Sequence, residues 1–294
     1  MPRRTLTAAV TVTAALLLTA CGSQEATGAG AASSSLPATG GAAVVAEPAW
    51  GLVHNLTLDG SRLLLGTHDG LWQQNPGEQA TLLSDPAFDV MGLTGAPEQL
   101  FASGHPGPDQ DLPADLGLRQ STDGGRSWQS VSLEGEVDFH RLRAVGSVIL
   151  GLSAHDGRLM RSPDSGVTWQ DLGTPPVYDI AVDPRDPDRV LATTEQGPVV
   201  STDGGTSFTP IDSAPLLALL AWAGRTVYAA APNRDLYTSG DAGTSWTRTG
   251  STGGPPSAIA ANGEHVVVVA GATIVESTDG GATFTPRITG LDEH

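Results

Sequence analysis

Histidine and carboxylate side chains stand close together at several places along this chain. His68 and Asp69 are adjacent, as are His155 and Asp156, and Asp138 precedes His140 by two residues. Imidazole nitrogens and carboxylate oxygens can hold a divalent metal ion, and imidazole changes its charge near neutral pH. The full candidate set for ligand binding or catalysis is His54, His68, Asp69, His105, Asp138, His140, His155, Tyr178 and Glu195.

A repeated octapeptide indicates the fold that must bring these residues together. Copies reading STDGGRSW, SPDSGVTW, STDGGTSF, SGDAGTSW and STDGGATF begin at residues 121, 162, 201, 239 and 277, so successive starts are 41, 39, 38 and 38 residues apart. A fixed period near forty residues is typical of β-propeller blades. Residues 51–290 divide into six such units, although the octapeptide of the first has decayed.

Each unit contains four short apolar runs, which we interpret as strands. In the third unit the first two strands are expected at FHRLRAV and VILGLS. We therefore predict an all-β, six-bladed propeller of four-stranded antiparallel blades. The alternative is a seventh, irregular blade that recruits residues 43–50.

The aspartates of the octapeptides are expected to shape turns. An aspartate can accept hydrogen bonds from backbone N–H groups two or more residues later, and the following glycine supplies a positive φ. Because the same residue recurs in one unit after another, we favour a structural over a catalytic role. These residues are Asp123, Asp164, Asp203, Asp241 and Asp279.

The octapeptide pattern, S-x-D-x-G-x-[ST]-[WF], resembles the Asp-box, or BNR repeat, of sialidases and related β-propellers. The segments VHNL, GTHDGLW, SGHPG, DFHRL and VLATTEQG further resemble a family of actinobacterial-type lipoproteins labelled as sialidase-like glycosyl hydrolases. More distantly, the chain is similar to photosystem assembly-factor and sortilin-type propellers, which bind rather than cleave. The resemblance thus implies either hydrolysis of a glycan or recognition of a partner.

Propeller geometry predicts which face the candidate residues share. The first strand of each blade lines the central channel, and its start lies on the same face as the end of the second strand. At the second position of the first strand the six units have His54, Met91, His140, Tyr178, Leu217 and Ser257. Histidines also follow the second strands of units one to three, which predicts a His-rich face on blades one to four. The alternative is that each histidine caps its own turn.

The second unit carries an insertion, residues 106–118, directly after His105. We expect it to fold over the same face as a lid or selectivity loop. Its acids, Asp109, Asp111 and Asp115, do not follow the spacing of an EF-hand, which favours a solvated loop over a calcium site.

The N-terminus has the pattern of an export signal. Arg3 and Arg4 precede an uncharged run over residues 5–20, and the sequence LTAC at its end resembles the lipobox of bacterial lipoproteins. We predict a signal peptide over residues 1–20, lipidation of Cys21, a flexible Gly/Ala/Ser linker over 21–48 and a propeller over 49–291. The chain would then be anchored to the outer face of the cytoplasmic membrane. The alternative is an ordinary secretory peptide that precedes an unrelated cysteine.

Composition excludes several function classes. The formal charge is −17, and all 15 basic residues are arginine, so a nucleic-acid partner is not expected. The single cysteine excludes a disulfide framework and a cysteine-rich zinc site. We expect a monomer.

Two functions remain after these exclusions. The preferred one is a binding or assembly module for an extracytoplasmic protein or glycan, and the alternative is a glycosyl hydrolase of unknown specificity. True sialidase activity is not expected, because only Arg141 and Arg143 stand on a channel-facing strand and both belong to one blade. A divalent metal on the His-rich face is compatible with either function, but the residues are too dispersed for a spacing test.

Overall fold

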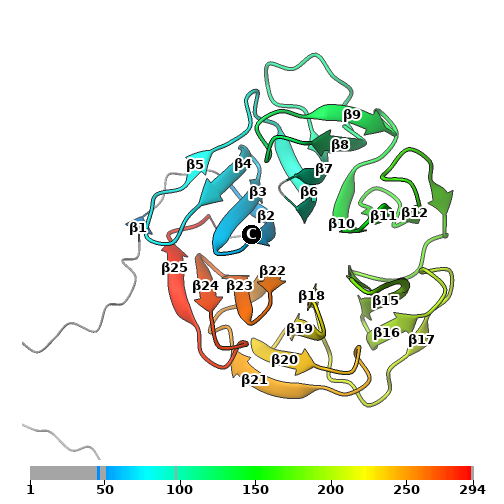
Figure 1. Cartoon of the computed structure of the whole chain (residues 1–294), viewed down its shortest axis with the longest axis vertical. Coiled ribbons are helices and arrows are strands. Elements are labelled where there is room, and N and C mark those ends of the chain that lie inside the picture. The colour runs from blue at the N-terminus through cyan, green and yellow to red at the C-terminus, as the bar shows by residue number, and fades with distance from the viewer. Residues whose placement is uncertain (1–44, 47–50, 97, 293–294) are drawn as a thin grey trace, which may run out of the picture. The chain divides into compact units, whose positions relative to one another are not determined.

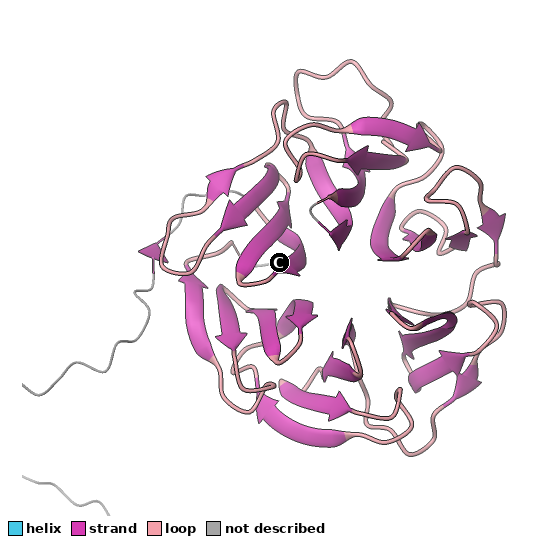
Figure 2. Ribbon diagram, in the orientation of Figure 1, coloured by secondary structure: helices cyan, strands magenta, loops and turns pink. Residues whose placement is uncertain are grey.

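The computed structural model describes residues 45–46, 51–96 and 98–292. Six four-stranded antiparallel sheets form a ring around a central channel (Figures 1 and 2), which confirms the predicted six-bladed, all-β propeller. The seven-bladed alternative is wrong. The strand β1 (Val45–Ala46) pairs in parallel with β25 (Thr285–Thr289), so it extends the sixth blade at its rim.

Each blade is a meander whose strands follow one another from the channel to the rim. Blades one to three comprise β2 (Val53–Asp59), β3 (Arg62–Thr67), β4 (Gly70–Gln74) and β5 (Thr81–Leu82); β6 (Asp89–Ala96), β7 (Gln99–His105), β8 (Leu118–Ser121) and β9 (Gln129–Ser132); β10 (Phe139–Val145), β11 (Val148–Ser153), β12 (Leu159–Ser162) and β13 (Gln170–Asp171).

Blades four to six have the same order of strands. They comprise β14 (Asp179–Asp183), β15 (Asp186–Thr194), β16 (Gly197–Ser201) and β17 (Thr209–Pro210); β18 (Leu219–Ala223), β19 (Thr226–Ala230), β20 (Asp235–Ser239) and β21 (Thr247–Ser251); β22 (Pro256–Asn262), β23 (His265–Ala270), β24 (Thr273–Ser277) and β25.

The hydrophobic core lies between the blades. Six clusters of buried side chains each join two consecutive blades, and the cluster between blades two and three contains Phe101 and Phe139. Second strands such as β3 are buried along nearly their whole length because neighbouring blades cover both of their faces. Blade six closes the ring on blade one through a similar cluster, and Arg287 Nε donates to Gln74 Oε1 at 2.7 Å.

The octapeptides form the hairpins between the third and fourth strands. In blade four the buried Ser201 hydroxyl accepts a hydrogen bond from Gly205 N–H at 2.8 Å and donates one to Asp203 at 2.7 Å. The exposed Asp203 carboxylate accepts from Ser207 N–H at 2.9 Å, and the other four copies repeat these contacts. The serine therefore satisfies the buried N–H group, and the aspartate holds the outer part of the turn.

A glycine in each hairpin allows it to pack against the preceding blade. Gly166 has a φ of +88°, and a Cβ there would lie 2.0 Å from Leu118 Cδ2 in blade two. A side chain would thus be strained twice, by its backbone conformation and by its neighbour.

The antiparallel order of strands separates two faces of the ring. The starts of first strands and the ends of second strands lie on one face, while the octapeptide hairpins lie on the other. The predicted signal peptide, Cys21 and most of the linker fall outside the described residues. Within the described part of the chain, no helix is long and apolar enough to cross a membrane.

Candidate functional site

Backbone bulges orient side chains at one mouth of the channel. In blades one, two, three and six the pairing of the first two strands shifts near the start of the first strand, at the second residue of β2, β10 and β22 and at the third residue of β6. A bulge changes the direction in which its extra residue points. These four residues, together with Arg141, line a cavity of about 260 Å³ at the channel mouth: His54, Met91, His140 and Ser257. We call the face of the ring that holds this mouth the histidine face.

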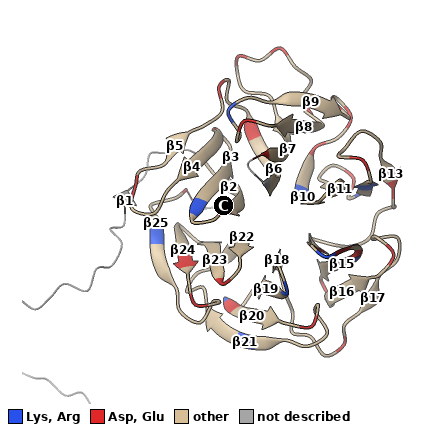
Figure 3. Cartoon of the chain, in the orientation of Figure 1, with Lys and Arg blue, Asp and Glu red and all other residues tan. Residues whose placement is uncertain are grey.

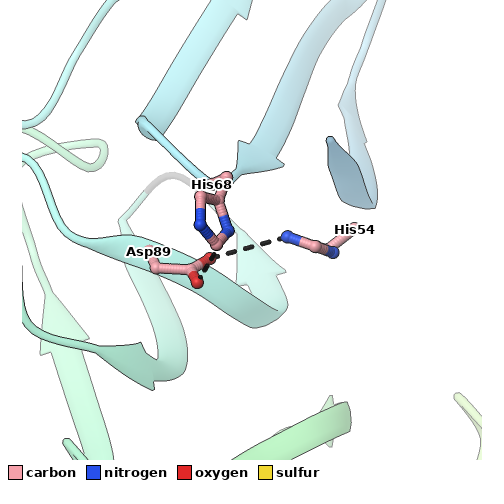
Figure 4. Close-up of side chains that lie close together, drawn as sticks. All are labelled: His54, His68 and Asp89. Carbon is pink, nitrogen blue, oxygen red and sulfur yellow. Dashed lines mark ion pairs between the residues drawn. The ribbon is translucent and has the colours of Figure 1, made fainter. Parts of the chain in front are cut away.

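The first histidine cluster joins blades one and two. His54 stands on β2, His68 follows β3, and both converge on the Asp89 carboxylate at the start of β6 (Figure 4). His68 Nδ1 lies 3.0 Å from Asp89 Oδ2, and His54 Nε2 lies 3.6 Å from Oδ1. The two rings are 6.0 Å apart. An acid of one blade thus reaches two histidines of the preceding blade.

The second histidine cluster joins blades two and three. Asp138, just before β10, lies with Oδ2 2.7 Å from His140 Nε2 and 3.4 Å from His105 Nε2. His105 ends β7, where it is paired across the sheet with Asp89 of β6. Directly opposed residues on neighbouring strands have adjacent side chains, so the two clusters are neighbours.

The end of the insertion contributes a third carboxylate to this face. His155 Nε2 lies 2.9 Å from Asp115 Oδ1, and His105 Nδ1 lies 2.9 Å from the carbonyl oxygen of Ala114. The hydrogen bond and charge of Asp115 raise the pKa of His155 above its usual value, and the charges of Asp138 and Asp156 act in the same direction. Asp115 therefore belongs to the histidine face and is not a solvated loop residue.

Burial controls the electrostatics of Asp89. Its removal from water raises the pKa of its carboxyl group above the usual value, and Asp138 adds to this effect. His68, His105 and His140 act in the opposite direction, because positive charge on them would stabilise the carboxylate. Asp89 is therefore a largely buried acid, and positive charge in either cluster would favour its ionised form.

Three of the predicted site residues lie apart from these clusters. Asp69, Tyr178 and Glu195 are exposed, and within the described ranges none of them has a hydrogen bond or ion pair to a clustered histidine. The candidate set lacked Asp115. Asp89 was also left out of that set, although its place at the start of a first strand, which resembles that of Asp138, made it a possible carboxylate of this face for glycoside hydrolysis.

The channel itself contains a cluster of arginine and aspartate side chains without a histidine. Arg141 and Arg143 of β10 line a cavity of about 500 Å³ with Asp179 of β14. Arg143 Nη2 donates to Asp179 Oδ1 at 3.0 Å, and Arg141 Nε lies 3.4 Å from the same oxygen. Asp179 Oδ2 accepts from Leu220 N–H at 2.8 Å. Both oxygens of this acid are engaged in contacts that hold blades three, four and five together.

Both histidine clusters have donor sets that suit a metal ion. In each, one atom from every member lies within 4.8 Å of the others, and the donors are two imidazole nitrogens and one carboxylate oxygen. Imidazole with carboxylate is a ligand set for divalent zinc and its first-row neighbours. Elsewhere in the ring, acidic residues are spread over loops and strands (Figure 3), and the described residues contain no third group of this kind.

Comparison with known proteins supports the architecture. No known protein family and no curated protein matches the sequence. A solved GH74 xyloglucanase from Xanthomonas campestris matches with a TM-score of 0.56 at 17% identity, over 83% of this chain and 46% of that chain. A chain of a nidogen/laminin complex gives 0.58 at 12% identity, covering 79% and 99% of the two chains. YCF48 bound to D1 peptide gives 0.50 at 18% identity, covering 82% and 84%.

These likenesses concern the fold. The chain spans less than half of the xyloglucanase it matches, and all three identities are below 20%. β-Propellers carry both enzymes and binding proteins, so a function has to be argued from the residues of the site. The chain is a six-bladed β-propeller similar in architecture to GH74 and YCF48 propellers.

Proposed function

We propose that this propeller is a recognition module that binds an extracytoplasmic protein or glycan on its histidine face. The observation that carries the proposal is the joint placement of polar and apolar groups there. Tyr178 is 60% exposed and Leu216 is 50% exposed, and each precedes the first strand of its blade, on the same face of the ring as the histidine clusters of blades one to three. An exposed aromatic and an exposed apolar side chain on a face that also carries ionisable groups are typical of a binding surface.

The arrangement of carboxylates favours binding over hydrolysis. A glycosidase needs two carboxyl groups that are free to act on a sugar as acid and as base or nucleophile. Asp89 and Asp138 each contact two histidines, and Asp115 contacts His155. Hydrogen bonds from Ser153 and Arg158 lower the pKa of Asp156, which makes it a poor proton donor. Asp89, Asp115 and Asp138 are therefore better suited to hold histidines than to cleave a glycosidic bond.

Site-specific photo-crosslinking tests where a partner binds. A photoreactive phenylalanine analogue at position 178 should crosslink a defined protein or glycan in a cell-envelope extract, and Leu216→Ser should weaken that product. The matched control is the same analogue at Val167, which is 66% exposed in an octapeptide hairpin on the opposite face. Equal crosslinking from both positions, or none from position 178, would contradict the proposal. A captured glycan that is cleaved on incubation would favour the hydrolase instead.

Export and anchoring form a separate part of the proposal. LTAC over residues 18–21 supplies the single cysteine at the position that lipidation requires. Cys21→Ser should move the protein from the membrane fraction to a soluble fraction, because the acyl chains would be lost. Cell fractionation with immunoblotting measures this, and an unchanged membrane fraction would refute the anchor.

A further inference from the structure

We propose that His105, Asp138 and His140 form a binding site for one divalent transition-metal ion, with zinc as the type ion. This inference is independent of the partner proposed above, because it concerns only the three side chains and the groups that hold them. Two imidazole nitrogens and one carboxylate oxygen make a three-ligand set, which leaves one position of a tetrahedral ion open.

The distances between donor atoms are close to those a bound ion requires. With metal–ligand bonds of about 2.0–2.2 Å, ligand atoms of a tetrahedral zinc site lie roughly 3.3–3.5 Å apart. His105 Nε2 and Asp138 Oδ2 are 3.4 Å apart, and His140 Nε2 is 2.7 Å from the same oxygen. The ligand atoms of all three residues lie within 4.8 Å of one another, and the ring of His140 lines the open cavity at the channel mouth, where it has room to adjust.

The surroundings of His105 hold its ring ready to ligate. Nδ1 lies 2.9 Å from the Ala114 carbonyl oxygen, which can only accept, so the proton of the neutral ring is on Nδ1. The lone pair of Nε2 then faces Asp138 Oδ2, and two electron-rich atoms are left facing one another. A cation between them relieves this repulsion. Metal-binding histidines commonly donate their other N–H group to a backbone carbonyl in this way.

Burial of Asp138 supplies an independent argument. The residue is 1% exposed, and Oδ1 has no hydrogen-bond donor within the described part of the chain. A buried carboxylate with an unsatisfied oxygen is costly unless a positive charge compensates it. A metal ion held through Asp138 Oδ2 would supply that charge to the carboxylate, whose only side-chain contacts in the described residues are those of His105 and His140 with the same oxygen.

The first cluster, of His54, His68 and Asp89, is less well organised for an ion. The side chain of His68 is 64% exposed, and His54 Nε2 stands 3.6 Å from the nearest Asp89 oxygen. The side chains of His105 and His140 are 37% and 38% exposed. Fixing a more mobile ring costs more conformational entropy on binding. We therefore assign the ion to the second cluster and use the first as a comparison.

Isothermal titration of the full chain with ZnCl₂ tests the site. The background is Cys21→Ser, which removes the thiol as a competing zinc ligand, and Co²⁺ absorption reports whether the bound ion is four-coordinate. We expect one equivalent to bind. His105→Gln and His140→Gln should each weaken binding by more than the roughly 10–100-fold that follows loss of an outer-shell partner.

Two matched controls locate the ion. His265→Gln removes a histidine that pairs with Glu276 on the opposite face, and the double variant His54→Gln/His68→Gln removes the first cluster. Both should bind zinc like the background protein. Absence of saturable binding, unchanged affinity in the His105 and His140 variants, or loss of binding only in the double variant would overturn the assignment.

Chemical modification of the histidines in the unsubstituted protein tests the site even if a variant fails to fold. Diethyl pyrocarbonate modifies accessible imidazole nitrogens, and peptide mass spectrometry gives the extent of reaction at each histidine. Zinc should protect His105 and His140 and leave His265 unchanged. Equal modification with and without zinc would refute the site in the protein as it is.

Discussion

Asp179 connects three consecutive blades through one carboxylate. Oδ1 accepts from Arg143 of blade three at 3.0 Å, while Oδ2 accepts from the backbone N–H of Leu220 in blade five at 2.8 Å. The residue itself belongs to blade four and is 1% exposed. Substitution by alanine would leave a guanidinium without its carboxylate and a buried N–H group without its acceptor.

The expected loss of stability can be worked out from these contacts. Removal of one partner from a buried ion pair costs about 3–5 kcal/mol, and an unsatisfied buried N–H costs about 1–3 kcal/mol. The side chain of Arg143 is 23% exposed and lines the channel cavity, so water recovers part of the first cost. We therefore expect Asp179→Ala to lower the free energy of unfolding by about 3 kcal/mol, which corresponds to a melting temperature lower by roughly 6–12 °C.

Urea denaturation and thermal melts followed by circular dichroism measure this difference. Asp188→Ala is the matched control, since it removes an arginine–aspartate contact of 2.6 Å to Arg161 in which the acid is 60% exposed. Such a surface pair contributes about 0–1 kcal/mol. A double-mutant cycle with Arg143→Met isolates the Asp179 pair, with an expected coupling of about 0.5–3 kcal/mol. The reasoning fails if Asp179→Ala and Asp188→Ala destabilise the chain equally.

Three further predictions concern the hairpins and the insertion. Ser201→Ala should lower stability by about 1–3 kcal/mol in urea melts, because the buried Gly205 N–H loses its acceptor; a change near zero would contradict this. Hydrogen bonds lower the pKa of Asp203 to about 2, so its contribution to stability is complete above pH 4 and is lost as the pH falls through 2. Asp203→Asn should therefore reduce the dependence of stability on pH in melts at pH 2–5. An unchanged pH dependence in the variant would contradict this role of Asp203. Asp115→Asn should lower the pKa of His155 measured by NMR, because the hydrogen bond and the charge of Asp115 raise it. The stability that this pair contributes is present below pH 6.5 and is lost as the pH rises through the raised pKa of the folded state. An unchanged titration of His155 would show that Asp115 does not cause the shift.

The sequence allowed the blade architecture to be predicted because the octapeptide marks the same hairpin in five blades. Once the hairpins were aligned, the apolar runs between them had only one arrangement into strands. The strands predicted at FHRLRAV and VILGLS coincide with β10 (Phe139–Val145) and β11 (Val148–Ser153). The role of the serine at the first position was not predicted, since its importance depends on its burial beneath the turn.

The site could be predicted only in part. Strand register located His54 and His140, because the start of each first strand lies at the same mouth of the channel. It did not predict the bulges that turn these residues, since a bulge shifts pairing without changing residue types. Asp115 was missed for a different reason. A loop of prolines and acids carries no periodic pattern, so its contact with His155 depends on where the loop returns to the blade.

The histidine clusters follow from the way a propeller closes, and this explains why their members are spread along the chain. Asp89 and Asp138 each open or precede a first strand, and each contacts a histidine that follows or ends the second strand of the previous blade. Repetition of the fold thus creates the same backbone junction between successive blades. The side chains at each junction determine whether it is apolar or can bind a ligand. Blade five has Ala231 and Pro232 after its second strand, and Leu217, which precedes its own first strand, is buried. An apolar junction of that kind stabilises the ring through burial of hydrophobic surface. Junctions with histidines and acids bury less hydrophobic surface and so contribute less stability, but their side chains can bind a cation. Their restriction to the first three blades is what the proposed ion site requires, whereas the fold itself needs no histidine at these junctions, as blade five shows.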